Sequence, residues 1–106
     1  MRRIYLAGPM TGIKDFNYPA FNAAAKLLRE NGYHVENPAE NSAPDCGTWL
    51  GYMRIAITQL ATCDMVVMLP GWSESRGAVV ERNLAKGLGL QVIDLSHLTQ
   101  QLAKQN

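Results

Sequence analysis

Residues 4–12 read IYLAGPMTG, a short and continuous apolar run that ends in a glycine-rich loop. Continuous apolar runs of this length are typical of strands covered on both faces, as in a parallel sheet. Residues 65–69, MVVML, repeat the pattern and lead into the polar loop 70–77. Two further apolar runs, at residues 33–35 and 90–95, complete a set of four expected strands.

Helical patterns lie between the expected strands. Apolar residues at helical spacing predict helices at residues 19–32, 47–62 and 76–88, and a short polar helix at 96–105 that begins at a serine N-cap. In the third helix, the side chains expected to face the core are Val80, Leu84 and Leu88.

Strands and helices alternate along the chain, so we expect one α/β domain over residues 1–106, a Rossmann-like or flavodoxin-like three-layer sandwich. Its parallel sheet should have four to five strands in the order 2-1-3-4. That order puts a topological switch between the first and third strands, and ligands bind such sheets outside the carboxyl ends of the strands at the switch. Loops 8–14 and 70–77 leave those two ends and are therefore the expected site.

The composition fits one globular domain: 106 residues, 47% hydrophobic and 18% charged. The net charge of +1 gives no reason to expect a nucleic-acid or membrane-surface partner. The apolar run near the N-terminus is too short for a signal peptide and no stretch is long enough to span a membrane, so we expect a cytoplasmic protein. Cys46 and Cys63 lack metal-like spacing, and we expect free thiols, no metal and no cofactor.

The loop at residues 8–12 matches neither common nucleotide signature, because it lacks both GxxxxGK[ST] and GxGxxG. Its glycines would let backbone N–H groups approach an anion, and Thr11 and Lys14 would add a hydroxyl and a charge. A plain strand-to-helix turn explains the same residues equally well.

The second loop carries four candidate residues for binding. Ser75 is a candidate N-cap of the third helix, and Arg76 and Gly77 at that helix N-terminus suit an anion. Trp72 either packs on a purine or pyrimidine face or anchors the loop.

Glu81 stands about a turn into the third helix, beside Val80 and three residues before Leu84. Partial burial there and the nearby helix N-terminus shift the pKa of a carboxyl group in opposite directions. The carboxylate is either ion-paired, to Arg54 or Arg82, or it faces a polar pocket.

Three motifs follow one another in a distinctive order: residues 4–12, CDMVVMLPGW at residues 63–72, and SRGAVVE at residues 75–81 followed by Ala85. Together they resemble the nucleoside 2-deoxyribosyltransferase-like superfamily, which includes 2'-deoxynucleoside 5'-phosphate N-hydrolases. The similarity runs from Ile4 to about Asp94 and is strongest to a branch of unknown function from bacteriophages and prophages.

The resemblance implies an N-glycosidase or deoxyribosyltransferase that acts on a deoxynucleoside or its monophosphate. By position, Glu81 would attack or stabilise the anomeric carbon. Ser75, six residues earlier, would help hold the substrate phosphate. The residues expected to bind substrate are Tyr5, Gly8, Pro9, Met10, Thr11, Gly12, Trp72, Ser75 and Gly77.

One position departs from the pattern of these enzymes. They carry an aspartate on the helix before the third strand, where this chain has Ala56. Loss of an acid–base group costs about two to four orders of magnitude in rate, and Asp45 or Glu74 would have to substitute from a loop. Two alternatives therefore stay open: a catalytically silent nucleotide-binding or sensing protein, and a phage accessory or interaction protein with a vestigial pocket.

The resemblance also implies a homodimer or a larger homo-oligomer. The second expected helix carries more apolar surface than one core face needs. Its candidate interface residues are Trp49, Tyr52, Met53 and Ile57.

Overall fold

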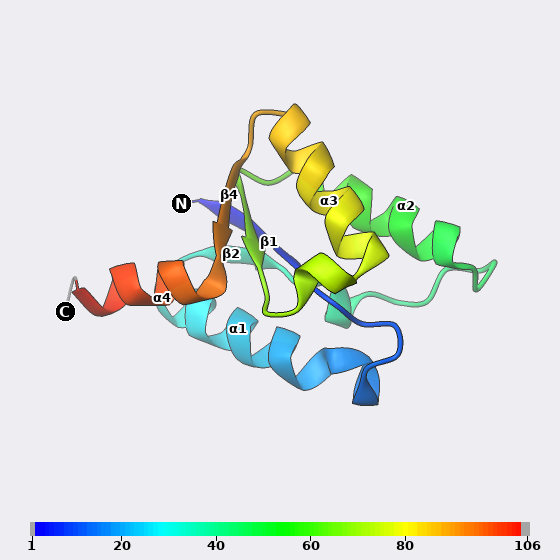
Figure 1. Cartoon of the computed structure of the whole chain (residues 1–106), viewed down its shortest axis with the longest axis horizontal. Helices are drawn as coiled ribbons and strands as arrows, with labels where there is room; N and C mark the ends of the chain where they lie inside the picture. Colours follow the sequence, from blue (N-terminus) through cyan, green and yellow to red (C-terminus); the bar gives the residue numbers. More distant parts are fainter. Residues whose placement is uncertain (1, 105–106) are drawn as a thin grey trace.

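A computed structural model describes residues 2–104 as a four-stranded sheet between two layers of helices (Figure 1). The strands are β1 (Arg3–Ala7), β2 (His34–Glu36), β3 (Met65–Met68) and β4 (Gln91–Asp94). The α-helices are α1 (Tyr18–Glu30), α2 (Trp49–Leu60), α3 (Arg76–Gly87) and α4 (Leu95–Lys104). Short 3₁₀ turns, which were not predicted, lie at Lys14–Asn17, Pro38–Glu40 and Trp72–Glu74.

The sheet is parallel throughout and its order is β2-β1-β3-β4, which confirms the predicted order. Tyr5 in β1 is opposite Glu36 on one side and Val66 on the other. The two continuous apolar runs thus form the central strands, where both faces are covered, and the switch point lies between them.

Side chains alternate between the two faces of the sheet, as the strand period requires. One face packs against α1 and α4 and presents Ile4, Leu6, Met65 and Val67. The other packs against α2 and α3 and presents Tyr5, Ala7, Val66 and Met68. Figure 1 shows the two helix pairs on opposite sides of the sheet, which makes the predicted three layers.

The buried face of α3 differs from the prediction. Ala78, Glu81 and Ala85 are buried, whereas Val80 and Leu88 are 42% and 52% exposed. The prediction that Val80, Leu84 and Leu88 face the core is therefore wrong for Val80 and Leu88. Small side chains allow the helix backbone to lie close to the sheet, and the choice of face follows that close packing rather than hydropathy.

Three helices also begin at other residues than expected, and α1 differs by one residue, since it begins at Tyr18. Helix α2 begins at Trp49, after Thr48, whose hydroxyl accepts a 3.1 Å hydrogen bond from the Gly51 N–H group and caps the helix. Helix α4 begins at Leu95, so Ser96 lies inside the helix rather than at its N-cap. Its predicted last residue, Gln105, lies outside the described residues.

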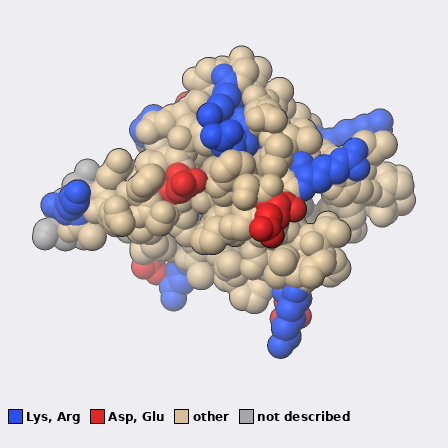
Figure 2. Space-filling model, in the orientation of Figure 1, with Lys and Arg blue, Asp and Glu red and all other residues tan. Residues whose placement is uncertain are grey.

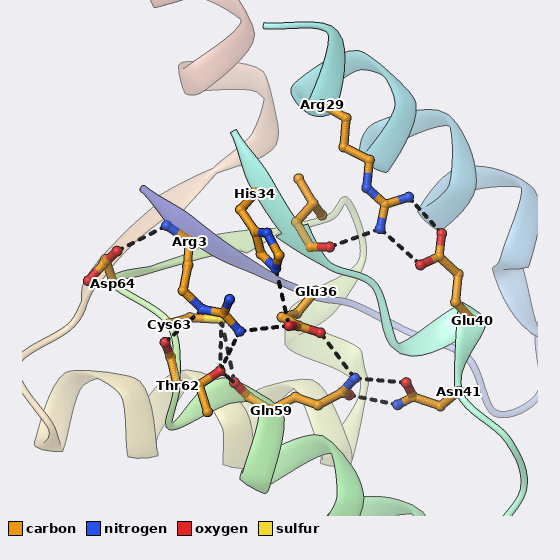
Figure 3. A network of polar contacts seen from close by, with 11 residues as sticks. Arg3, Arg29, His34, Glu36, Glu40, Asn41, Gln59, Thr62, Cys63 and Asp64 are labelled. Carbon is orange, nitrogen blue, oxygen red and sulfur yellow. Dashed lines mark hydrogen bonds and ion pairs between the residues drawn. The ribbon is translucent and has the colours of Figure 1, made fainter. Parts of the chain in front are cut away.

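A polar network ties α2 to the β1–β2 side of the sheet (Figure 3). The Arg3 guanidinium lies 2.7 Å from a Glu36 carboxylate oxygen and donates a 3.0 Å hydrogen bond to the Thr62 hydroxyl. Gln59 of α2 donates to Glu36 and exchanges two hydrogen bonds with Asn41, at 2.6 and 2.8 Å. These contacts fix the position of α2 against the sheet.

Within residues 2–104, none of the helices has the length and apolar character that crossing a membrane requires.

Candidate functional site

A cavity of about 310 Å³ lies between the loop that follows β1 and the loop that follows β3. This volume is at the lower end of the range for small-molecule sites. Its lining residues are Pro9, Thr11, Ile13, Asn17, Pro70, Gly71, Glu74 and Ser75. The structure thus brings together the two loops that the switch-point argument selects.

Three of the residues expected to bind substrate, Pro9, Thr11 and Ser75, line this cavity. The expected residues that are not among its lining are Tyr5, Gly8, Met10, Gly12, Trp72 and Gly77. The sequence reasoning missed Ile13, Asn17 and the Pro70–Gly71 pair as lining residues. Ile13, Pro70 and Gly71 lie within loops 8–14 and 70–77 but were not named as binding residues, and Asn17 lies three residues beyond the first loop.

Two of the expected glycines have a packing role. A Cβ atom on Gly8 would lie 2.8 Å from the Leu69 Cβ, so only glycine lets the ends of β1 and β3 come this close. A Cβ on Gly77 would lie 3.2 Å from the Met53 sulfur, where α3 approaches α2. Both glycines thus allow close packing between the elements that carry the cavity loops.

One wall of the cavity is built from unusual backbone. Asp15, Phe16 and Asn17 have φ angles of 54°, 52° and 60°, in the left-handed region that non-glycine residues rarely adopt. The Asn17 amide donates a 3.0 Å hydrogen bond to the Pro9 carbonyl, which ties this turn to the glycine-rich loop. Such conformations cost about 1–3 kcal/mol each and are found mostly at functional sites.

Tyr5 and Glu81 form a buried pair on the face of the sheet that packs against α2 and α3. Tyr5 is fully buried and Glu81 is 6% exposed. The Tyr5 hydroxyl donates a hydrogen bond to Oε2 of Glu81. The described residues include no ion pair between Glu81 and Arg54 or Arg82, so the ion-pair alternative does not hold for them.

The proton affinity of this pair is set chiefly by burial. Burial raises the pKa of Glu81 from 4.5 to about 7, and the hydrogen bond from Tyr5 opposes the rise. Burial, and then the neighbouring Glu81 carboxylate, raise the pKa of Tyr5 well above its ordinary value. Near neutral pH, Glu81 can therefore either hold or release a proton, as acid–base and nucleophilic groups do.

Ala56 lies in the apolar cluster that contains Tyr5 and Ala78. Among the described residues, Glu81 is the one charged group in the buried core, and the other buried polar residue is Asn37. Of the two loop acids considered as substitutes, Glu74 lines the cavity, whereas Asp45 lines neither this cavity nor its neighbour.

A second cavity of about 180 Å³ shares Pro70 and Gly71 with the first and lies beside the ends of β3 and β4. Trp72 lines it, and the Arg82 guanidinium lies 4.7 Å from the centroid of the Trp72 ring. The indole is half-buried against the α2–α3 side of the core, which agrees with its role as an anchor of the loop.

Two of the residues expected to form an interface on α2, Trp49 and Met53, make contacts within the chain. The Arg76 guanidinium lies 4.0 Å from the centroid of the Trp49 ring, and Met53 faces Gly77. Tyr52 is 47% exposed. The homo-oligomer remains a prediction, for which Tyr52 is the most accessible contact residue among the four proposed.

No three His, Cys, Asp or Glu side chains in residues 2–104 lie close enough together to hold a metal ion.

The fold and the cavity at its switch point define a small parallel α/β domain with a ligand-sized site. The chain belongs to the family described as "Domain of unknown function (DUF4406)", whose model matches residues 2–94. No curated protein matches it in sequence.

Among solved structures, the chain is similar to a 2-desoxiribosyltransferase from Leishmania mexicana, with a TM-score of 0.71 and 19% sequence identity. The match covers 89% of this chain but 63% of that one, so this chain spans less than two thirds of its neighbour's length. At this identity the likeness shows the fold.

Proposed function

We propose that this chain binds a 2'-deoxynucleoside or its 5'-monophosphate between the β1 and β3 loops and cleaves the N-glycosidic bond, with Glu81 as the group that meets the sugar. One observation carries the proposal: a buried glutamate with a pKa of about 7, held by Tyr5 on the strand that leads into the cavity loop. The name of the structural neighbour, a 2-desoxiribosyltransferase, supports the substrate class.

The chemistry needs Glu81 in its carboxylate form. As the bond between C1' and the base nitrogen breaks, its electron pair leaves with the base, which takes up a proton, and positive charge develops on the sugar. The carboxylate stabilises that charge or bonds to C1'. Water, in a hydrolase, or a second base, in a transferase, then takes the sugar and frees Glu81.

Tyr5 has a positioning role in this scheme. Its hydroxyl donates to one carboxylate oxygen, which orients Glu81 and favours its charged form. Since Glu81 is 6% exposed and is not a lining residue of the cavity, the loops at residues 8–17 and 70–75 must adjust when the sugar reaches it.

The direct test is release of free base. The protein is incubated with the four natural deoxynucleosides and their 5'-monophosphates, and the products are separated by chromatography. We expect base from at least one substrate and none with Glu81→Gln, which keeps the shape but removes the carboxylate. Folded wild-type protein that releases no base from any substrate contradicts the enzymatic proposal.

A second candidate function is nucleotide binding without turnover. It is favoured by Ala56, which places a methyl group in the cluster around Tyr5 where an acid is expected. Calorimetry distinguishes the two, because a silent protein binds a nucleoside or nucleotide and leaves it intact. A protein that shows neither binding nor turnover fits the third alternative, an accessory or interaction protein.

A further inference from the structure

The charges that line the two cavities are all negative. Among the residues that line the first cavity, Glu74 is the single charged one, and Asp94 is the single charged one in the second. Neither lining includes a lysine, arginine or histidine. A ligand in these cavities would therefore meet carboxylates without a cation to neutralise its own negative charge.

The nearest cations on α3 are engaged with aromatic rings. The Arg76 guanidinium lies over Trp49 of α2, and that of Arg82 lies over Trp72. On the face seen in Figure 2, the basic side chains form separate groups with acidic groups between them, and they do not merge into one basic surface.

The N-terminus of α3 is also partly satisfied within the chain. The Ser75 oxygen accepts a 3.2 Å hydrogen bond from the Ala78 N–H group, which uses one of the free donors of the first turn. Among residues 2–104, neither the Ser75 nor the Thr11 hydroxyl group donates a hydrogen bond, so both can donate to a ligand, and Glu74 offers acceptors. This set suits a neutral ligand group that carries hydroxyl or amino hydrogens.

We infer that Glu74 is a specificity-determining residue that makes this site favour an unphosphorylated deoxynucleoside over its 5'-monophosphate. The inference rests on the proposed function and narrows its substrate class. A phosphomonoester carries nearly two negative charges at neutral pH, and next to an unneutralised carboxylate each charge is repelled. A 5'-hydroxyl group instead donates a hydrogen bond to the same carboxylate.

The test compares affinities at one fixed ionic strength, because salt screens the repulsion. Calorimetry measures binding of each natural deoxynucleoside and its 5'-monophosphate to the wild-type chain. We expect the nucleoside to bind at least about tenfold more tightly, and Glu74→Gln to reduce this ratio by about tenfold, equivalent to about 1.4 kcal/mol. Glu30→Gln, at the end of α1, is the matched control: it makes the same change at an exposed residue outside both cavities, and the ratio should stay unchanged.

The possible outcomes separate this inference from the proposed function. The role of Glu74 is overturned if the monophosphate binds as tightly as the nucleoside or more tightly, or if the two substitutions have equal effects. Neither result contradicts the proposed cleavage of the N-glycosidic bond. A strong preference for the nucleoside without base release supports the role of Glu74 and contradicts the enzyme. Absence of binding by both classes of compound overturns both.

Discussion

The hydroxyl group of Tyr5, in the centre of β1, donates a hydrogen bond to Oε2 of Glu81, on the buried face of α3. Two effects of opposite sign act on the glutamate: burial favours its neutral form and the hydrogen bond favours its carboxylate form. Burial is the larger effect, so the pKa stays at about 7. The hydrogen bond can be removed by substitution while the burial of Glu81 is kept.

Replacement of Tyr5 by phenylalanine removes the donor and keeps the ring. The pKa of Glu81 should then rise above about 7, because burial acts alone. If the carboxylate form is the active one, kcat/KM for base release increases with pH through this pKa, and in Tyr5→Phe the increase moves to higher pH. The control is Tyr52→Phe, an exposed position on α2 that should leave the profile in place. An unshifted profile in Tyr5→Phe contradicts the positioning role.

Replacement of Glu81 by glutamine should stabilise the fold in alkaline solution. The pKa of Glu81 is 4.5 in its ordinary state and about 7 in the folded chain, so the folded state binds the proton more tightly. Stability is therefore lost as the pH rises from 4.5 to about 7. At about pH 8 the variant should be more stable than wild type by about 3 kcal/mol in urea unfolding, and the gain should vanish near pH 4.

Glu40→Gln gives a control of opposite sign. The hydrogen bond from Arg29 lowers the pKa of Glu40, so its charged form stabilises the fold and the substitution should weaken it at about pH 8. A Glu81→Gln variant that is no more stable than wild type at that pH would show that the carboxyl group is hydrated in the folded chain.

Replacement of Gly8 by alanine should destabilise the fold. The new methyl group would lie 2.8 Å from the Leu69 Cβ, and relief of that contact requires the ends of β1 and β3 to move apart. Overpacking of this kind costs about 1–3 kcal/mol, measured as the free energy of unfolding. Gly87→Ala, at the end of α3 with open space around it, should be neutral or slightly stabilising. Equal effects of the two substitutions would argue against the close approach at Gly8.

Replacement of Ala56 by aspartate restores the acid that the resemblance leads one to expect. If the missing proton donor limits the rate, base release should increase by about 10²- to 10⁴-fold. The matched control is Ala56→Asn, which has nearly the same shape but cannot transfer a proton in this way. A gain shared by both variants would point to altered packing around Tyr5 rather than to acid catalysis.

The central part of the fold could be predicted from the sequence because it depends on local patterns. The apolar runs at residues 4–7 and 65–69 identify the strands that are covered on both faces, and their loops mark the switch point. Glu81 could be singled out as a candidate because a carboxylate among apolar residues on a helix is rare. The buried face of this helix was misjudged, because the more hydrophobic Val80 is 42% exposed whereas the smaller Ala78 is buried.

The shape of the cavity depended on backbone that sequence patterns do not predict. Three successive non-glycine residues in the left-handed region, Asp15 to Asn17, turn Ile13 and Asn17 into one wall. Left-handed residues of this kind occur singly as a rule, so no pattern would place three in a row. The pairing of Arg76 and Arg82 with tryptophan rings likewise depends on contacts between elements distant in the chain.

Ala78 and Ala85, the short residues on either side of Glu81 along the buried face of α3, hold the helix near the sheet and keep water from the carboxyl group. The acid strength of Glu81 is thereby coupled to the separation of two layers of the domain. Any event that lifts α3 from the sheet, whether a bulkier side chain or a binding partner, would hydrate the glutamate and make it a stronger acid. A change in the packing of α3 against the sheet would then cause Glu81 to release a proton.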